Sequence, residues 1–115
     1  PRVLQGASYA QARKDAANWL GEVGLSARRG HKPHQVSGGE MQRAAIARAL
    51  INQPAVILAD EPTGNLDSVT AAQILALFSH LHRQWGKTII LASHAPEAGS
   101  AADRVLRLAD GRLLA

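Results

Sequence analysis

Two short apolar runs constrain the fold of this chain more than any other feature. Residues 55–59 and residues 88–92 are continuous rather than alternating, and each run leads directly into polar residues. Runs of this length are typical of parallel strands that are buried on both faces. Between them, apolar residues recur at helical spacing from Ile74 to Trp85, and Gly86 ends the pattern. Strand, helix and strand in alternation predict an α/β fold with a mostly parallel sheet.

Helices are predicted to dominate the first 50 residues. Ser8, with Gln11 three positions later, forms a capping-box pattern ahead of apolar positions at helical spacing. Ser37 and Glu40 repeat this pattern at the start of an Ala-rich run of high helix propensity. We therefore expect a helical lobe followed by part of a sheet lobe.

The end of the chain predicts a β-hairpin. The mostly apolar segments 105–108 and 112–114 flank the dipeptide Asp110-Gly111, a typical two-residue hairpin turn. A short helix is predicted to start near Pro96, between the second strand and this hairpin.

Composition excludes several classes of protein. The 115 residues contain no Cys, which excludes a disulfide framework and Cys-based metal sites. The 13 Lys and Arg against 9 Asp and Glu are scattered, so we expect no nucleic-acid partner. No run approaches the ~18 apolar residues of a membrane helix. Pro1 stands where a start Met is expected, which indicates that the chain begins inside something larger.

The start of the second predicted helix is a candidate anion site. Gly38 and Gly39 follow Ser37 there and leave several backbone N–H groups unpaired. These donors and the positive end of the helix suit a phosphate group. Taken alone, the pattern favours a capped helix with a flexible entry.

The residues that follow the two strands are candidates for catalysis. Asp60 can hold Mg²⁺ while substrate phosphates complete its shell, and Glu61 can orient and deprotonate a water molecule. His94 can contact a terminal phosphate or the attacking water. Taken singly, the acidic pair fits a solvated turn about as well, and His94 fits a surface histidine better.

Taken in order, these motifs resemble the ATP-binding-cassette (ABC) ATPase family. Residues 36–43 are similar to its signature sequence, residues 56–61 to its Walker B strand, residues 65–67 to its D-loop and His94 to its switch histidine. Residues 60–67 are especially similar to the branch that serves lipoprotein release, macrolide-type efflux, antimicrobial-peptide export and bacterial cell division. The resemblance covers nearly the whole chain.

The resemblance implies part of a P-loop NTPase fold: the helical subdomain, then the C-terminal part of a mostly parallel sheet and a terminal β-hairpin. Residues 1–50 would form the helical subdomain and signature helix, and residues 51–115 the catalytic-core strands and helices. The P-loop pattern G-x-x-x-x-G-K-[ST] is absent, because Gly86-Lys87-Thr88 has Leu81 at the position of the first glycine. We therefore expect the P-loop half of the domain to lie outside these residues.

The resemblance also implies nucleotide contacts across a dimer. In the family, two ATPase domains pair head to tail, with ATP between the P-loop of one and the signature sequence of the other. Ser37, Gly38, Gly39 and Glu40 would then bind ATP that the partner domain holds. Asp67 would link the two sites across the interface.

The remaining implied roles concern hydrolysis and transport. Asp60 would position Mg²⁺, Glu61 would act as general base on water, and His94 would sense the γ-phosphate. Closing and opening of the dimer would move a membrane permease, which docks partly on residues 1–36. Such a subunit would be peripheral, at the cytoplasmic face of the inner membrane.

Two alternatives remain open from the residues alone. One is an ABC-type ATPase of DNA repair or chromosome organisation, which shares the signature and Walker B motifs. The other is a truncated half-domain with no activity. For the isolated chain we expect negligible ATP hydrolysis, because it has no P-loop. We also expect it to aggregate or to fold only in part, because the incomplete sheet exposes an apolar face.

Overall fold

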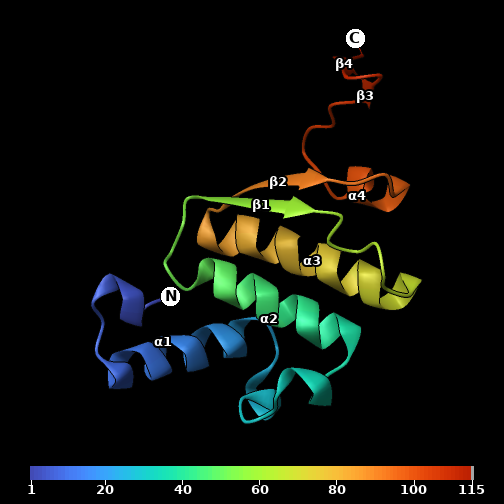
Figure 1. Ribbon diagram of the computed structural model, residues 1–115. Helices are drawn as coiled ribbons and strands as arrows, with labels where there is room; N and C mark the ends of the chain where they lie inside the picture. Colours follow the sequence, from blue (N-terminus) through green and yellow to red (C-terminus); the bar gives the residue numbers. More distant parts are fainter. Residues whose placement is uncertain (115) are drawn as a thin grey trace.

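The computed structural model describes residues 1–114 and places the three longest helices on one side of a small sheet (Figure 1). Figure 1 shows β1 (Val56–Asp60) and β2 (Thr88–Ala92) above α3 (Ser68–Trp85), α3 above α2 (Gly38–Leu50), and α2 above α1 (Tyr9–Glu22). The main elements, in chain order, are α1 (Tyr9–Glu22), α2 (Gly38–Leu50), β1 (Val56–Asp60), α3 (Ser68–Trp85), β2 (Thr88–Ala92), α4 (Pro96–Ser100), β3 (Leu108–Ala109) and β4 (Arg112–Leu113). Three short 3₁₀ helices accompany them: η1 (Val3–Gln5), η2 (Ser26–Arg28) and η3 (Pro33–Gln35).

The strand–helix–strand unit that the apolar runs predict is confirmed. β1 and β2 pair in parallel, from Val56 opposite Thr88 to Asp60 opposite Ala92. α3 connects the end of β1 to the start of β2. The carboxyl ends of both strands therefore meet at one edge of the sheet, which is where open α/β sheets bind their ligands.

One hydrophobic core lies between the sheet and the helices. It joins buried side chains from α1, the turn that follows it, α2, β1 and α3: Trp19, Val23, Leu25, Ile46, Ala47, Leu50, Ile57, Ile74, Leu77, Phe78 and Leu81. The predicted stripe on α3 is confirmed except at its end, where Trp85 is half exposed and its ring centroid lies 5.2 Å from that of Trp19. Gly86 ends α3 in the left-handed conformation, at φ +62°.

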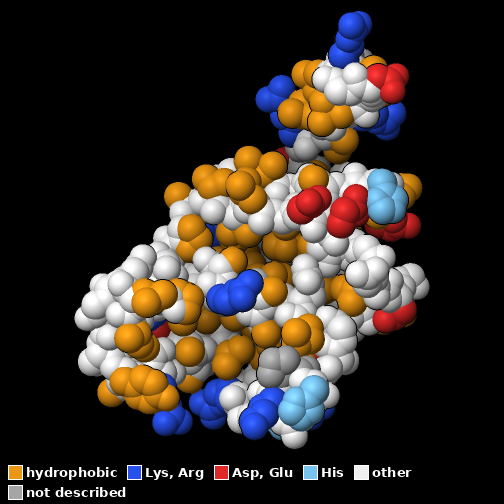
Figure 2. Space-filling view, in the orientation of Figure 1, with side chains coloured by type: hydrophobic (Ala, Val, Ile, Leu, Met, Phe, Trp, Pro, Cys, Tyr) orange, Lys and Arg blue, Asp and Glu red, His pale blue; other side chains and the backbone are white. Residues whose placement is uncertain are grey.

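The prediction that both strands are buried on both faces is wrong for this chain. Ile57 points into the core at 4% exposure, whereas Leu58 is 75% exposed and Ile90 is 57% exposed. The reason is that the helices cover one face of the two-stranded sheet, and no element of the described residues covers the other. Hydrophobic side chains are visible over the strands in Figure 2. The expected exposed apolar face is therefore confirmed.

The start of α1 follows the predicted cap in one half only. The Ser8 hydroxyl accepts a hydrogen bond from the backbone N–H of Gln11 at 3.2 Å, as a capping Ser does. The Gln11 side chain does not reach back to Ser8; it donates to Asp15 at 2.8 Å. The charged carboxylate of Asp15 is a strong acceptor for the side-chain N–H of Gln11. The Arg2 guanidinium also donates to this carboxylate, at 2.8 Å, and holds it in place.

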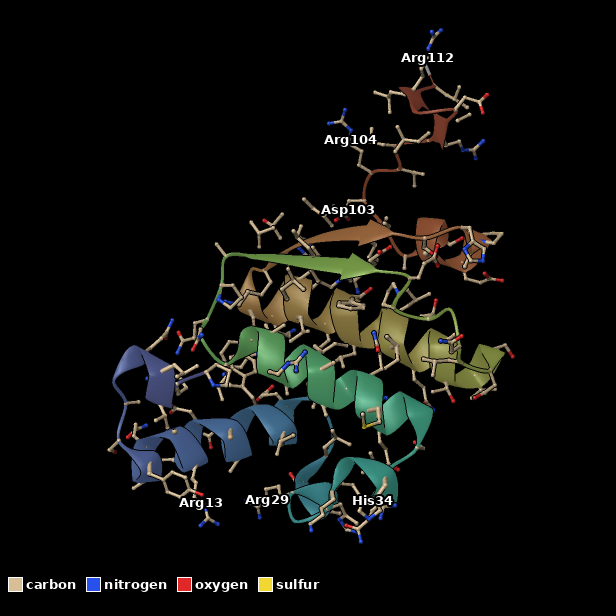
Figure 3. The ribbon with its side chains drawn as sticks, viewed as in Figure 1. Arg13, Arg29, His34, Asp103, Arg104 and Arg112 are labelled. Atoms are coloured by element: carbon tan, nitrogen blue, oxygen red, sulfur yellow. The ribbon has the colours of Figure 1, made fainter. Side chains whose placement is uncertain are left out.

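The terminal hairpin forms, with shorter strands than the apolar pattern predicts. Asp110 and Gly111 have φ values of +50° and +73°, as both positions of a type I′ turn require. Val105 and Leu106 lie before the first strand rather than in it. In Figure 3 the segment that carries Arg104 and Arg112 projects away from the helices and the sheet.

The polar segment between α1 and α2 is less irregular than the expected loop, because it contains η2 and η3. Figure 3 shows Arg13, Arg29 and His34 on the side of the molecule opposite the sheet, directed outward. Within the described residues, no helix has both the length and the apolar character needed to cross a membrane.

Candidate functional site

The carboxyl ends of β1 and β2 bring two of the predicted site residues into contact. Glu61 follows β1, and its Oε1 accepts a hydrogen bond from the backbone N–H of His94 at 3.1 Å. The same oxygen lies 2.7 Å from Nδ1 of the His94 ring. With Glu61 ionised, Nδ1 carries the proton and donates it to this hydrogen bond. The two side chains therefore act as one unit at the sheet edge.

The backbone of Glu61 adopts an unusual conformation that aims its carboxylate toward the second strand. Its φ is +45°, in the left-handed region that few residues other than glycine occupy. Two backbone hydrogen bonds hold this turn: Glu61 N–H donates to the carbonyl of Ala92 at 2.8 Å, and Gly64 N–H donates to the carbonyl of Glu61 at 3.1 Å. Strain of this kind concentrates at functional sites.

The electrostatics of this pair keep the carboxylate charged. The hydrogen bond from the His94 side chain, with smaller contributions from its charge and its backbone N–H, holds the pKa of Glu61 below its usual range. The His94 side chain is 86% exposed and that of Glu61 is 40% exposed, so a ligand can reach both. At neutral pH the Glu61 carboxylate presents an accessible negative charge.

Ser93 is a member of this cluster to which the sequence assigned no role. Its Oγ lies 3.4 Å from the second carboxylate oxygen of Glu61 and accepts a hydrogen bond from the N–H of Ala95 at 3.1 Å. The sequence feature that could have indicated it is a hydroxyl residue directly before His94, at the end of an apolar run.

Asp60, the predicted Mg²⁺ ligand, is exposed at the last position of β1. Among the described residues, no group of three or more His, Asp and Glu gathers to hold a metal ion by itself. Mg²⁺ is usually held by one or two carboxylates, with waters and substrate phosphates completing its shell. A single accessible carboxylate beside Glu61 fits that kind of site.

The start of α2 carries the residues predicted to bind nucleotide. The Ser37 hydroxyl caps the helix by accepting from the N–H of Glu40 at 3.2 Å, as the sequence predicts. The Glu40 carboxylate turns away from Ser37 and pairs with Arg28, with 3.2 Å between Nε and Oε2. Gly38 is exposed, so the first turn of α2 is open to a ligand on that side.

Asp67 caps α3, a role that the sequence analysis did not predict. Its Oδ2 accepts from the N–H of Thr70 at 3.1 Å, and its Oδ1 accepts from the Thr70 hydroxyl at 2.5 Å. These hydrogen bonds lower the pKa of Asp67. An Asp followed three positions later by a Thr at a helix start was the available signal.

The predicted site residues therefore form two clusters. One joins Glu61 with His94 where the strands end; the other joins the start of α2 to the start of α3. Figure 1 shows that the strand ends and both helix starts lie on the same side of the molecule. In Figure 2, acidic side chains and a histidine gather at this edge of the sheet.

Comparison with known proteins decides the family. The profile described as ABC transporter matches residues 3–64. The chain belongs to the ABC transporter family. The lipoprotein-releasing system ATP-binding protein LolD of Bordetella avium is 50% identical over 114 residues, which are 99% of this chain and 50% of that protein. The macrolide export ATP-binding/permease protein MacB of Rhodopirellula baltica is 52% identical over 106 residues, 92% of this chain and 16% of that protein.

Solved structures give the same result for the fold. The ATP-binding cassette MJ0796, in a dimeric post-hydrolysis state bound to ADP and Pi, aligns with a TM-score of 0.78 at 42% identity. The alignment covers 93% of this chain and 47% of that one. The prediction of a partial ABC ATPase fold is therefore confirmed, and the chain spans about half the length of the LolD relative, at 50%.

Proposed function

We propose that this chain is the C-terminal part of an ATPase domain that powers an ABC transporter, with residues 1–50 as helical subdomain and signature helix and residues 51–115 in the catalytic core. The hydrogen-bonded pair of Glu61 and His94, at the edge where the two parallel strands end, is the observation that carries the proposal. Ligands of α/β sheets bind at that edge, and the pair supplies a charged acceptor beside a donor.

In this proposal Glu61 receives a hydrogen bond from the attacking water and takes its proton. Its lowered pKa makes the carboxylate a weak base that is charged at neutral pH. Phosphoryl transfer through a loose transition state depends more on positioning and charge than on strong basicity, so a weak base is sufficient. His94 holds the carboxylate in place and senses the γ-phosphate. Asp60 would hold Mg²⁺, which supplies charge stabilisation to the phosphates when bound.

The second cluster would act on nucleotide held by a partner ATPase domain. The N–H groups at the start of α2, after Ser37, would bind the γ-phosphate of that ATP. Asp67 would connect the two sites of the dimer. The dimeric state of MJ0796 bound to ADP and Pi supports this arrangement.

The transported cargo would belong to the export or lipoprotein-release class. The names of the relatives support it: a lipoprotein-releasing system in one, macrolide export in the other. A permease would dock partly on residues 1–36, and the protein would be peripheral at the cytoplasmic face of the inner membrane. The activity belongs to the complete polypeptide, since a chain without a P-loop would not hydrolyse ATP alone.

The test is ATP turnover by the complete polypeptide that carries these residues. Glu61→Gln should bind ATP but lose about 100-fold or more in Mg²⁺-dependent turnover, because the amide accepts no proton. Glu97→Gln is the matched control, since Glu97 is another exposed carboxylate, on α4, and should leave turnover near wild type. Near-normal turnover by Glu61→Gln would refute the role of this carboxylate.

A further inference from the structure

The second glycine of α2 is in contact with the first turn of α3. Gly39 is buried, and a Cβ at this position would overlap the Cγ2 methyl of Thr70, with the Thr70 Cβ at 3.9 Å. At the neighbouring Gly38, a Cβ would lie 3.4 Å from Leu66, a tight contact that small shifts relieve. The packing inside this chain therefore requires a glycine at position 39, independently of any nucleotide.

The Thr70 methyl cannot simply move aside. The hydroxyl on the same Cβ donates to Asp67 Oδ1 at 2.5 Å, and the backbone N–H of Thr70 donates to Oδ2 at 3.1 Å. Threonine has a few staggered χ1 positions, so a rotation that removes the methyl from Gly39 also removes the hydroxyl from Asp67. One rotation of the Thr70 side chain would therefore break both the contact with Gly39 and the hydrogen bond to Asp67.

We infer that Thr70 is a positioning residue that locks the start of α2 to Asp67 through its methyl and its hydroxyl. The nucleotide-facing segment at Gly39 and the interface residue Asp67 then keep one relative position. The consequence for ATP turnover rests on the proposed function, whereas the packing between Gly39 and Thr70 does not.

The methyl half of the inference is tested by a double substitution in the complete polypeptide. Gly39→Ala should lower the melting temperature by about 4 °C or more, because the core is overpacked there. Thr70→Ser removes the methyl and keeps the hydroxyl, so alone it should shift the melting temperature by about 2 °C or less. Gly39→Ala combined with Thr70→Ser should recover most of the loss.

The melting temperatures of Gly39→Ala and of the double variant decide whether the Thr70 methyl is the obstacle at Gly39. Recovery by Thr70→Ser, or folding of the double variant where Gly39→Ala alone does not fold, supports the contact. A double variant as unstable as Gly39→Ala, or as unable to fold, overturns it, because the methyl of Thr70 would then not be the obstacle.

The hydroxyl half is tested by Thr70→Val, which keeps a methyl at the contact and removes the donor to Asp67. The kcat for ATP should fall several-fold with little change in KM, and Thr70→Ser, which keeps the donor to Asp67 and loses only the methyl contact, should lower kcat less. Equal kcat in Thr70→Val and Thr70→Ser would overturn the link to Asp67. If the wild-type polypeptide shows no turnover, the proposed function fails, and the melting comparison at Gly39 still decides the packing.

Discussion

The two faces of the small sheet differ in what they contribute to the molecule. Toward the helices, Leu50, Ile74 and Leu81 are fully buried, and the two Trp rings close one end of the core. On the opposite face, Leu58 and Ile90 are largely exposed to solvent. Stability in the described residues therefore comes from one face only.

The edge of the sheet that carries Glu61 and His94 is open to solvent, as the exposed face is and the core is not. The side chains of Glu61 and His94 are accessible, and they are held by hydrogen bonds between two strand ends instead of by apolar packing. We therefore expect folding and the proposed chemistry to depend on separate parts of this chain. Substitutions can therefore be chosen that change one without the other.

The largest predicted effect concerns the two faces directly. Leu81→Ala should cost about 2–5 kcal/mol of unfolding free energy, since it leaves a cavity in the core. Leu58→Ala removes the same atoms from the exposed face and should cost about 0.5 kcal/mol or less. Urea unfolding of the 115-residue chain at low concentration, followed by Trp fluorescence, measures both. Equal losses would show that the exposed face is covered in solution, and the contrast between the faces would be wrong.

A smaller effect separates two caps of similar geometry. The hydroxyls of Ser8 and Ser37 each accept a backbone N–H at 3.2 Å, so Ser→Ala at either position should cost about 1 kcal/mol. Ser37→Ala should also weaken ATP turnover by the complete polypeptide, whereas Ser8→Ala should not. Parallel measurements of melting and turnover check this. A matching loss of turnover in Ser8→Ala would mean that turnover merely follows stability.

The smallest predicted effect concerns pH. Because the pKa of folded Glu61 lies below its unfolded value, its stabilising contribution is present above the unfolded pKa and is lost as pH falls through the folded pKa. His94→Ala removes the main cause and should raise the Glu61 pKa toward its ordinary value. An NMR titration of the Glu61 carboxyl tests this. An unchanged titration in His94→Ala would show that the pair does not form in solution.

Local patterns allowed much of the fold to be predicted. Continuous apolar runs predicted β1 and β2, and the strand pairing then brought Glu61 to His94. Asp110 and Gly111 predicted the hairpin turn, because positive φ at two successive positions is costly for most other residues. These features depend on residues that are close in sequence or on strand ends that must meet.

The rest depended on long-range packing that spacing does not encode. The sequence shows that Leu58 is apolar. Whether its side chain is buried or exposed depends on which element covers that face of the sheet. The contact between Gly39 and Thr70 joins residues on two helices. That the Thr70 methyl fills the space of a side chain at Gly39 depends on how these helices pack, which the sequence pattern does not indicate. The positive φ of Glu61 likewise follows from its hydrogen bonds to the second strand and the following turn.

The most direct test of the separation between folding and chemistry is the melting temperature of Glu61→Gln in the complete polypeptide, measured on the sample used for ATP turnover. We predict that turnover falls about 100-fold or more while the melting temperature stays within about 2 °C of wild type. A large fall in melting temperature together with turnover would contradict it, because Glu61 would then be a structural residue of the sheet edge.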